Sequence, residues 1–170
     1  MNWQFLFLGL FLLNLILFWS LKKHLWYRVI GLILMGFIPL VTVFVEQPHF
    51  QLDYYWWRLA GVVAILLGCF VAGWAKIEFL KSGMWPFSEP QKVVKTGPYA
   101  FIRHPLYLGL IFFLVGWWWI WATVYSFYFG MFILLMIWVQ AWLEEKLIME
   151  KKFPEEYKAY KKQTGMFWIK

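Results

Sequence analysis

The sequence predicts an all-α integral membrane protein with five transmembrane helices, a long cytosolic loop and a short C-terminal interfacial helix. The chain is 63% hydrophobic and only 15% charged, and a soluble domain of this size would need more polar residues to cover its surface. Several apolar runs also approach or exceed the roughly 20 residues that cross a bilayer. We therefore treat the chain as a single membrane domain, residues 1–170.

Residues 1–75 contain the first three predicted spans, Trp3–Leu21, Val29–Val45 and Trp56–Ala75. The first span is followed by Lys22 and Lys23, whereas a signal peptide carries its positive charges ahead of the apolar run, so we expect this span to be retained. The third span has small residues every four positions along one face: Ala60, Ala64, Gly68 and Ala72. Small residues at this spacing let helix backbones approach closely in lipid, so we predict a packing face there.

Residues 76–104 form a polar cytosolic connector, long enough to be a functional lid or a connection along the membrane surface. Residues 105–170 then contain a helical hairpin and a tail. Its two spans, Pro105–Trp121 and Thr123–Trp142, are joined so tightly that they must be antiparallel neighbours. Their far ends, with His104 on one helix and the Glu144–Glu145 pair on the other, should therefore meet at the same membrane face.

The tail is predicted to begin as a continuation of the fifth span to about Lys152. Phe153 precedes Pro154, which disfavours helical geometry at Phe153 and suits the first position of a new helix. Phe153, Tyr157 and Tyr160 then form an apolar stripe surrounded by lysines. This pattern is typical of an interfacial helix, which we expect to lie against the polar ends of the hairpin.

The positions of Lys and Arg predict the orientation in the membrane. With five spans, Lys22, Lys23 and Arg28, the connector and the lysine-rich tail fall on one side, and Arg58 falls on the other. Because positive loops stay in the cytosol, the N-terminus should lie outside and the C-terminus in the cytosol. The net charge of +7 then suits anionic lipid headgroups, and nucleic acid is not an expected partner.

Six side chains are predicted to meet at the cytosolic ends of the last two helices: Tyr99, Arg103, His104, Tyr107, Glu144 and Glu145. Ionisable groups at membrane depth are costly and usually functional. An ion pair between Arg103 and the glutamates that merely anchors the helix ends explains the same residues. A zwitterionic ligand such as S-adenosylmethionine would also suit them, with its carboxylate on Arg103 and its cation against a glutamate and aromatic faces.

Two segments, GPYAFIRHPLYLG and, one helical hairpin later, EEKLIMEKKFPEEYKAYKK, together resemble the isoprenylcysteine carboxyl methyltransferase family. They also resemble the wider group that holds phospholipid N-methyltransferases. The resemblance covers roughly Val94–Lys162. It implies an all-helical membrane methyltransferase that uses S-adenosylmethionine bound from the cytosol. The methyl acceptor would be lipophilic and reach the site from the bilayer, either an isoprenylcysteine carboxylate or a lipid amine.

The resemblance also implies roles for individual residues. Arg103 and Glu144 are the predicted catalytic residues, with the two adjacent glutamates not distinguished by the motif itself. The predicted cofactor-binding residues are Tyr99, His104, Pro105, Tyr107, Gly109, Glu144, Glu145 and Tyr157. Tyr157 belongs to this set because the tail aromatics would close a slot for the adenine.

Other kinds of site are less well supported by the sequence. The single cysteine, Cys69, excludes an intrachain disulfide or a multi-cysteine metal site, and we expect no metal. Membrane reductases that use a nicotinamide cofactor share a similar C-terminal motif and are the alternative enzyme class. A non-catalytic helical membrane protein is the alternative outside enzymes. The sequence predicts no particular oligomeric state.

Overall fold

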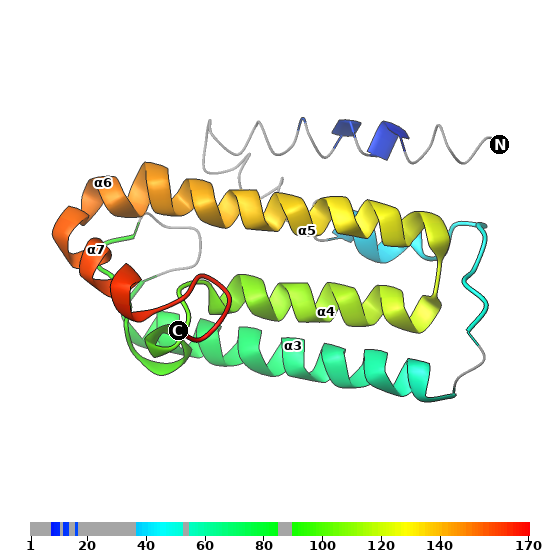
Figure 1. Cartoon of the computed structure of the whole chain (residues 1–170), viewed down its shortest axis with the longest axis horizontal. Coiled ribbons are helices and arrows are strands. Elements are labelled where there is room, and N and C mark those ends of the chain that lie inside the picture. The colour runs from blue at the N-terminus through cyan, green and yellow to red at the C-terminus, as the bar shows by residue number, and fades with distance from the viewer. Residues whose placement is uncertain (1–7, 11, 14–15, 17–36, 53–54, 85–89) are drawn as a thin grey trace. The chain divides into compact units, whose positions relative to one another are not determined.

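The computed structural model describes residues 8–10, 12–13, 16, 37–52, 55–84 and 90–170, and the regular elements of these residues are helices (Figure 1). The prediction of an all-α chain is confirmed for this part. The predicted span Trp3–Leu21 lies outside the described residues except for positions 8–10, 12–13 and 16, which are helical. Of the predicted span Val29–Val45, residues 37–42 are helical and residues 29–36 lie outside the described part.

Two helices in the described part are long and apolar enough to cross a membrane. These are α3, Tyr55–Lys81, and the continuous helical run Val124–Lys152, which begins with α5, Val124–Glu144. The helix α4, Pro105–Trp121, has the predicted bounds and is strongly apolar but is shorter, with 17 residues. Five transmembrane spans are therefore not established by the helices described.

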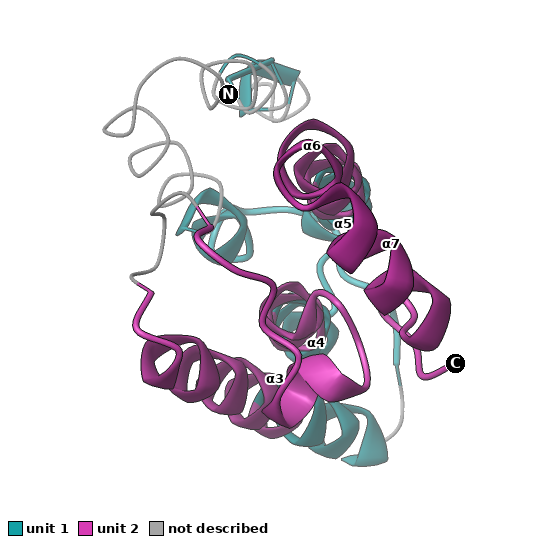
Figure 2. Ribbon diagram, turned by 90° about the vertical axis from the view of Figure 1, so that its left-hand side faces the viewer, with its two compact units in different colours: residues 1–65, 114–136 teal, residues 66–113, 137–170 magenta. Residues whose placement is uncertain are grey.

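The chain forms two compact units, residues 1–65 with 114–136 and residues 66–113 with 137–170 (Figure 2). In the first unit, a buried amide fixes the loop that precedes α3 to the start of α5. The Gln47 side chain accepts a hydrogen bond from the Ser126 backbone N–H at 2.9 Å and donates to the Thr42 carbonyl at 2.7 Å. Gly61 and Gly116 are also closely packed, because a Cβ at Gly116 would lie 2.5 Å from the Gly61 carbonyl oxygen.

In the second unit, small residues let α3 and α4 approach closely, as the spacing of small residues predicted for α3. A Cβ at Gly68 would lie 2.6 Å from the Gly109 carbonyl oxygen, and one at Gly109 would lie 2.6 Å from the Ala72 backbone nitrogen. The helix α3 continues six residues past the predicted end at Ala75. Residues 76–81 contain good helix formers and no Gly or Pro, and the helix is followed by Gly83 with a φ of 79°.

The end of the hairpin has a feature that the sequence did not predict. The helix continues to Lys152 as expected, but Glu145–Met149 form a π-helical segment, η2, between α5 and the short α6, Glu150–Lys152. The next helix, α7, runs from Pro154 to Gln163 and has Phe153 at its N-cap, as predicted. Its buried Tyr157 and Tyr160 pack with Val93. This cluster attaches α7 to the connector that precedes η1.

Candidate active site

Every predicted site residue belongs to the second unit, where a turn, a helix start and the chain's end come together. Gly97 and Pro98, two residues typical of turns, begin the 3₁₀ helix η1, Gly97–Ala100. Three residues later the backbone pairs with the tail: the Arg103 N–H donates to the Gly165 carbonyl at 2.9 Å, and the His104 N–H donates to the Met166 carbonyl at 3.2 Å. The C-terminal segment therefore holds Arg103 and His104 at the start of α4.

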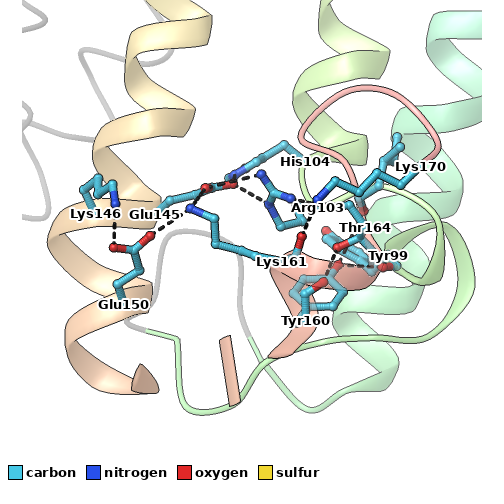
Figure 3. Close-up of polar contacts among 11 residues, drawn as sticks. Tyr99, Arg103, His104, Glu145, Lys146, Glu150, Tyr160, Lys161, Thr164 and Lys170 are labelled. Carbon is cyan, nitrogen blue, oxygen red and sulfur yellow. Dashed lines mark hydrogen bonds and ion pairs between the residues drawn. The ribbon is translucent and has the colours of Figure 1, made fainter. Parts of the chain in front are cut away.

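Glu145 lies at the centre of a buried ionic cluster (Figure 3). Its Oε1 atom lies 2.6 Å from Arg103 Nε and 3.1 Å from His104 Nε2, while its Oε2 atom lies 3.0 Å from Lys161 Nζ. The Glu145 side chain is 2% exposed and those of Arg103 and His104 are 8% exposed. The predicted convergence of His104 with the glutamate pair is thus confirmed. A buried carboxylate needs such partners because burial without them would disfavour its charged form.

All three nitrogens of the Arg103 guanidinium contact protein groups. Its Nη2 atom is 3.5 Å from Glu145 Oε2, in addition to the shorter contact of Nε, and its Nη1 atom donates to the Thr164 carbonyl oxygen. The planar guanidinium of an arginine can bind a carboxylate through two nitrogens at once, which is bidentate hydrogen bonding. In this structure the carboxylate that occupies the fork of Nε and Nη2 is that of Glu145.

Glu144 has a different environment from its neighbour. Its Oε2 atom accepts a hydrogen bond from the Tyr107 hydroxyl at 3.1 Å, and the residue is partly exposed. The Tyr107 ring stacks on His104, with ring centroids 5.5 Å apart and planes 23° apart. Burial, followed by the negative charge of Glu144, raises the pKa of Tyr99. Glu144 is therefore a partly exposed carboxylate that is hydrogen-bonded to Tyr107 and whose charge also acts on Tyr99.

Tyr157, Tyr160 and Lys161 come to the site from α7. Burial, with a contribution from the charge of Glu145, raises the pKa of Tyr157. The Tyr160 hydroxyl donates to the Tyr99 carbonyl oxygen at 2.5 Å, and burial raises the pKa of Tyr160 to about 12. Burial opposes the charge of Lys161, but hydrogen bonds to Glu150 and Glu145 outweigh it and raise its pKa. Sequence reasoning did not select Lys161, which is one of several lysines in the tail.

Two predicted cofactor-binding residues occupy places with clear packing roles. Pro105 is buried as the first residue of α4, where a missing N–H costs nothing. Gly109 lies against the α3 backbone near Gly68 and Ala72, so that any side chain there would collide with α3. The described residues contain no cluster of three or more His, Cys, Asp or Glu that could hold a metal ion.

Residues 56–156 match the sequence profile of the phospholipid methyltransferase family. The chain belongs to the phospholipid methyltransferase family. No curated protein and no solved structure matches it. Because the profile covers more than half of the chain, including the first motif and the second as far as Glu156, it identifies an S-adenosylmethionine-dependent membrane methyltransferase that acts on a lipid acceptor. This favours methyl transfer over the nicotinamide-dependent and non-catalytic alternatives.

The side chains around Glu144 fit S-adenosylmethionine chemically. The partly exposed carboxylate of Glu144, bound by the Tyr107 hydroxyl, offers negative charge beside an aromatic side chain to a sulfonium or ammonium group. The neighbouring ionic cluster contributes the positive side chains of Arg103 and Lys161. The same small region therefore provides groups of both signs, as a zwitterionic cofactor requires.

Proposed function

We propose that this methyltransferase transfers a methyl group to a lipid amine and that Glu144 is the carboxylate at the reacting centre. The observation that carries the proposal is the contrast between the two glutamates. Glu145 is buried in contact with Arg103, His104 and Lys161. Glu144 is partly exposed and bound by the Tyr107 hydroxyl. A substrate can therefore reach Glu144 while Glu145 serves the protein's own cluster.

The state of Arg103 argues for an amine over a carboxylate acceptor. An isoprenylcysteine carboxylate is already ionised at neutral pH and needs a cation to orient it. Arg103, the residue predicted for that task, holds Glu145 and the Thr164 carbonyl. An acceptor carboxylate that took the Nε and Nη2 fork would displace Glu145 and break a buried pair, which is costly. In our proposal Arg103 therefore acts by fixing Glu145 and the tail, and is a positioning residue.

A lipid amine requires what Glu144 can provide. The amine is protonated at neutral pH, and it must lose that proton before its nitrogen lone pair can attack a methyl group. A Glu144 oxygen would accept the proton while the Tyr107 hydroxyl holds Oε2 in place. When bound, S-adenosylmethionine supplies a methyl group on a sulfonium sulfur, which leaves as a neutral thioether. Alignment of the nitrogen with this methyl group is the enzyme's main contribution.

We also propose that the cofactor's cationic end lies against Tyr99, Tyr107 and Glu144, with His104 stacked behind Tyr107. Pro105, Gly109, Glu145 and Tyr157 would support this site through packing and charge. The site end of the helices would face the cytosol. Supporting this orientation, Arg58 is the sole Lys or Arg among the described residues of the first unit, whereas the second unit contains the connector and tail lysines.

The test is methyl incorporation from labelled S-adenosylmethionine into defined lipids in nanodiscs. The panel contains phosphatidylethanolamine as the primary amine and an isoprenylcysteine as the carboxylate. We expect a base-stable N-methyl product from the amine. A base-labile methyl ester formed from the isoprenylcysteine alone would reverse the choice of acceptor. Glu144→Gln should abolish incorporation, and Glu155→Gln, which removes an exposed acid on α7, is the matched control.

A further inference from the structure

The π-helical segment Glu145–Met149 has one residue more in its turn than an α-helix. The Glu150 N–H donates to the Glu145 carbonyl, five residues earlier, whereas an α-helix pairs residues four apart. Such segments are rare and concentrate at functional sites. Here the segment begins at the buried glutamate of the ionic cluster, directly after Glu144.

The π turn changes which side chains share a face of the helix. In an α-helix, residues five apart are separated by roughly 140° around the axis, because each residue turns the chain by about 100°. In a turn closed by a bond between residues five apart, the same two positions lie on one face, much as residues four apart do in an α-helix. The side chains of Glu145 and Glu150 are therefore placed on one face by the π turn, and an α-helical turn would separate them.

Lys161 of α7 binds both of these carboxylates. Its Nζ atom lies 3.0 Å from Glu145 Oε2 and 2.8 Å from Glu150 Oε1 (Figure 3). Lys146 also binds Glu150, at 2.8 Å from Oε2, but this is an ordinary pair of residues four apart within the helix. Lys161 is thus the side chain that joins Glu145 to Glu150.

The helix is fixed on both sides of this turn. At its beginning, Glu144 contacts Tyr107 of α4 and Glu145 contacts Arg103, two residues before α4. At its end and beyond it, Met149 and Phe153 pack against the cluster of Val93, Tyr157 and Tyr160. A return to α-helical pairing would rotate one side relative to the other by about one residue, or roughly 100°. Either the glutamates or the hydrophobic contacts would then lose their partners.

We propose that Lys161 is a positioning residue that holds the π turn by bridging Glu145 and Glu150, and so directs Glu144 toward Tyr107. The effect on the π turn stands on the contacts alone. The effect on catalysis rests on the proposed role of Glu144. Through this bridge, docking of α7 controls the geometry of a site on another helix.

Hydrogen–deuterium exchange of the full-length protein in detergent, without cofactor, tests the first part. Lys161→Met and Glu150→Gln should each speed exchange of the amides of residues 145–153 by about tenfold, because each removes a charge-assisted contact. Lys161→Arg should restore slow exchange. The control is Lys146→Met, which takes a lysine from Glu150 but leaves the bridge, and should change exchange by no more than about twofold. Wild-type exchange in both Lys161→Met and Glu150→Gln would overturn the proposal.

Methylation kinetics test the second part. Lys161→Met should lower kcat for the lipid amine by about tenfold or more, and Lys161→Arg should recover most of it. Equal kcat in Lys161→Met and Lys146→Met would remove the positioning role. If Lys161→Met does not fold, Glu150→Gln, which retains the Lys161–Glu145 pair, decides both measurements. A wild-type protein that shows the expected exchange pattern but methylates no amine would refute the proposed acceptor and leave the role of Lys161 in the π turn intact.

Discussion

The Nε atom of Arg103 lies 2.6 Å from Oε1 of Glu145, and the two side chains are 8% and 2% exposed. This pair joins the start of α4 to the end of α5, and the bond from Arg103 to the Thr164 carbonyl adds the tail. Breaking a buried pair by removing one charge is strongly destabilising because the other charge stays buried. Among the described residues, the adjacent and partly exposed Glu144 has a hydrogen bond from the Tyr107 hydroxyl but no comparable ionic network.

Glutamine substitutions at the two glutamates should therefore have different consequences. Glu145→Gln should lower the free energy of unfolding by about 3 kcal/mol, because Arg103 and Lys161 lose a buried anion. Glu144→Gln should lower it by less than about 1 kcal/mol, the net contribution of one hydrogen bond, yet remove methylation. Thermal unfolding in detergent and incorporation of labelled methyl groups measure these effects. Equal stability losses in the two variants would contradict the assignment of separate roles.

The close contact of α3 with α4 predicts opposite effects for two glycines of α3. A Cβ at Gly68 would lie 2.6 Å from the Gly109 carbonyl oxygen and from the Phe113 backbone nitrogen, whereas one at Gly73 meets nothing within 4 Å. Gly68→Ala should lower the free energy of unfolding by about 1–3 kcal/mol through overpacking. Gly73→Ala should raise it by up to about 1 kcal/mol, because alanine favours helix. Chemical unfolding of both variants in detergent is the measurement, and a stabilised Gly68→Ala would exclude the close contact.

The sequence predicted the helical elements well where local signals were strong. Pro105 at the start of α4, Pro154 at the start of α7 and the stripe of Tyr157 and Tyr160 all have local physical causes, namely ring geometry and helical spacing. The small-residue face of α3 predicted packing, but not that Gly109 would be the partner. Contacts of that kind depend on how two helices are aligned, which no single segment specifies.

The sequence predicted which residues meet at the candidate site, but not which of them form pairs with one another. The tight turn between α4 and α5 was enough to place His104 near the glutamate pair, and the structure agrees. The sequence could not distinguish Glu144 from Glu145, because the two side chains point about 100° apart and the sequence does not give the rotation of the helix. The π turn and the selection of Lys161 among the tail lysines depend on the docking of α7, a tertiary effect without a local sequence signal.

The stability of the protein at alkaline pH should depend on the buried hydroxyl of Tyr160. Its pKa is raised from 10.0 to about 12 in the folded protein, mainly by burial. The folded state therefore keeps a proton that the unfolded chain releases first, so this contribution to stability is complete below pH 10 and is lost as the pH rises from 10 to about 12. Tyr160→Phe should reduce the steepness of this loss and cost about 1 kcal/mol at neutral pH through the missing bond to Tyr99. Unfolding curves across this range measure both, and identical alkaline slopes in the two proteins would contradict the prediction.

The proposed orientation in the membrane can be tested with single cysteines at Gln51 and Gln163. Gln51 lies in the loop before α3 and Gln163 ends α7, and both are exposed. The native Cys69 is also exposed and is first replaced by serine. Because the basic residues surround the site end, the positive-inside rule places Gln163 in the cytosol and Gln51 outside.

In intact cells a membrane-impermeant thiol reagent should label Gln51→Cys, and Gln163→Cys should react after the membrane is opened. Both cysteines should react in detergent, which controls for local accessibility. Labelling of both from the same side would exclude the five-span arrangement and the cytosolic placement of the site.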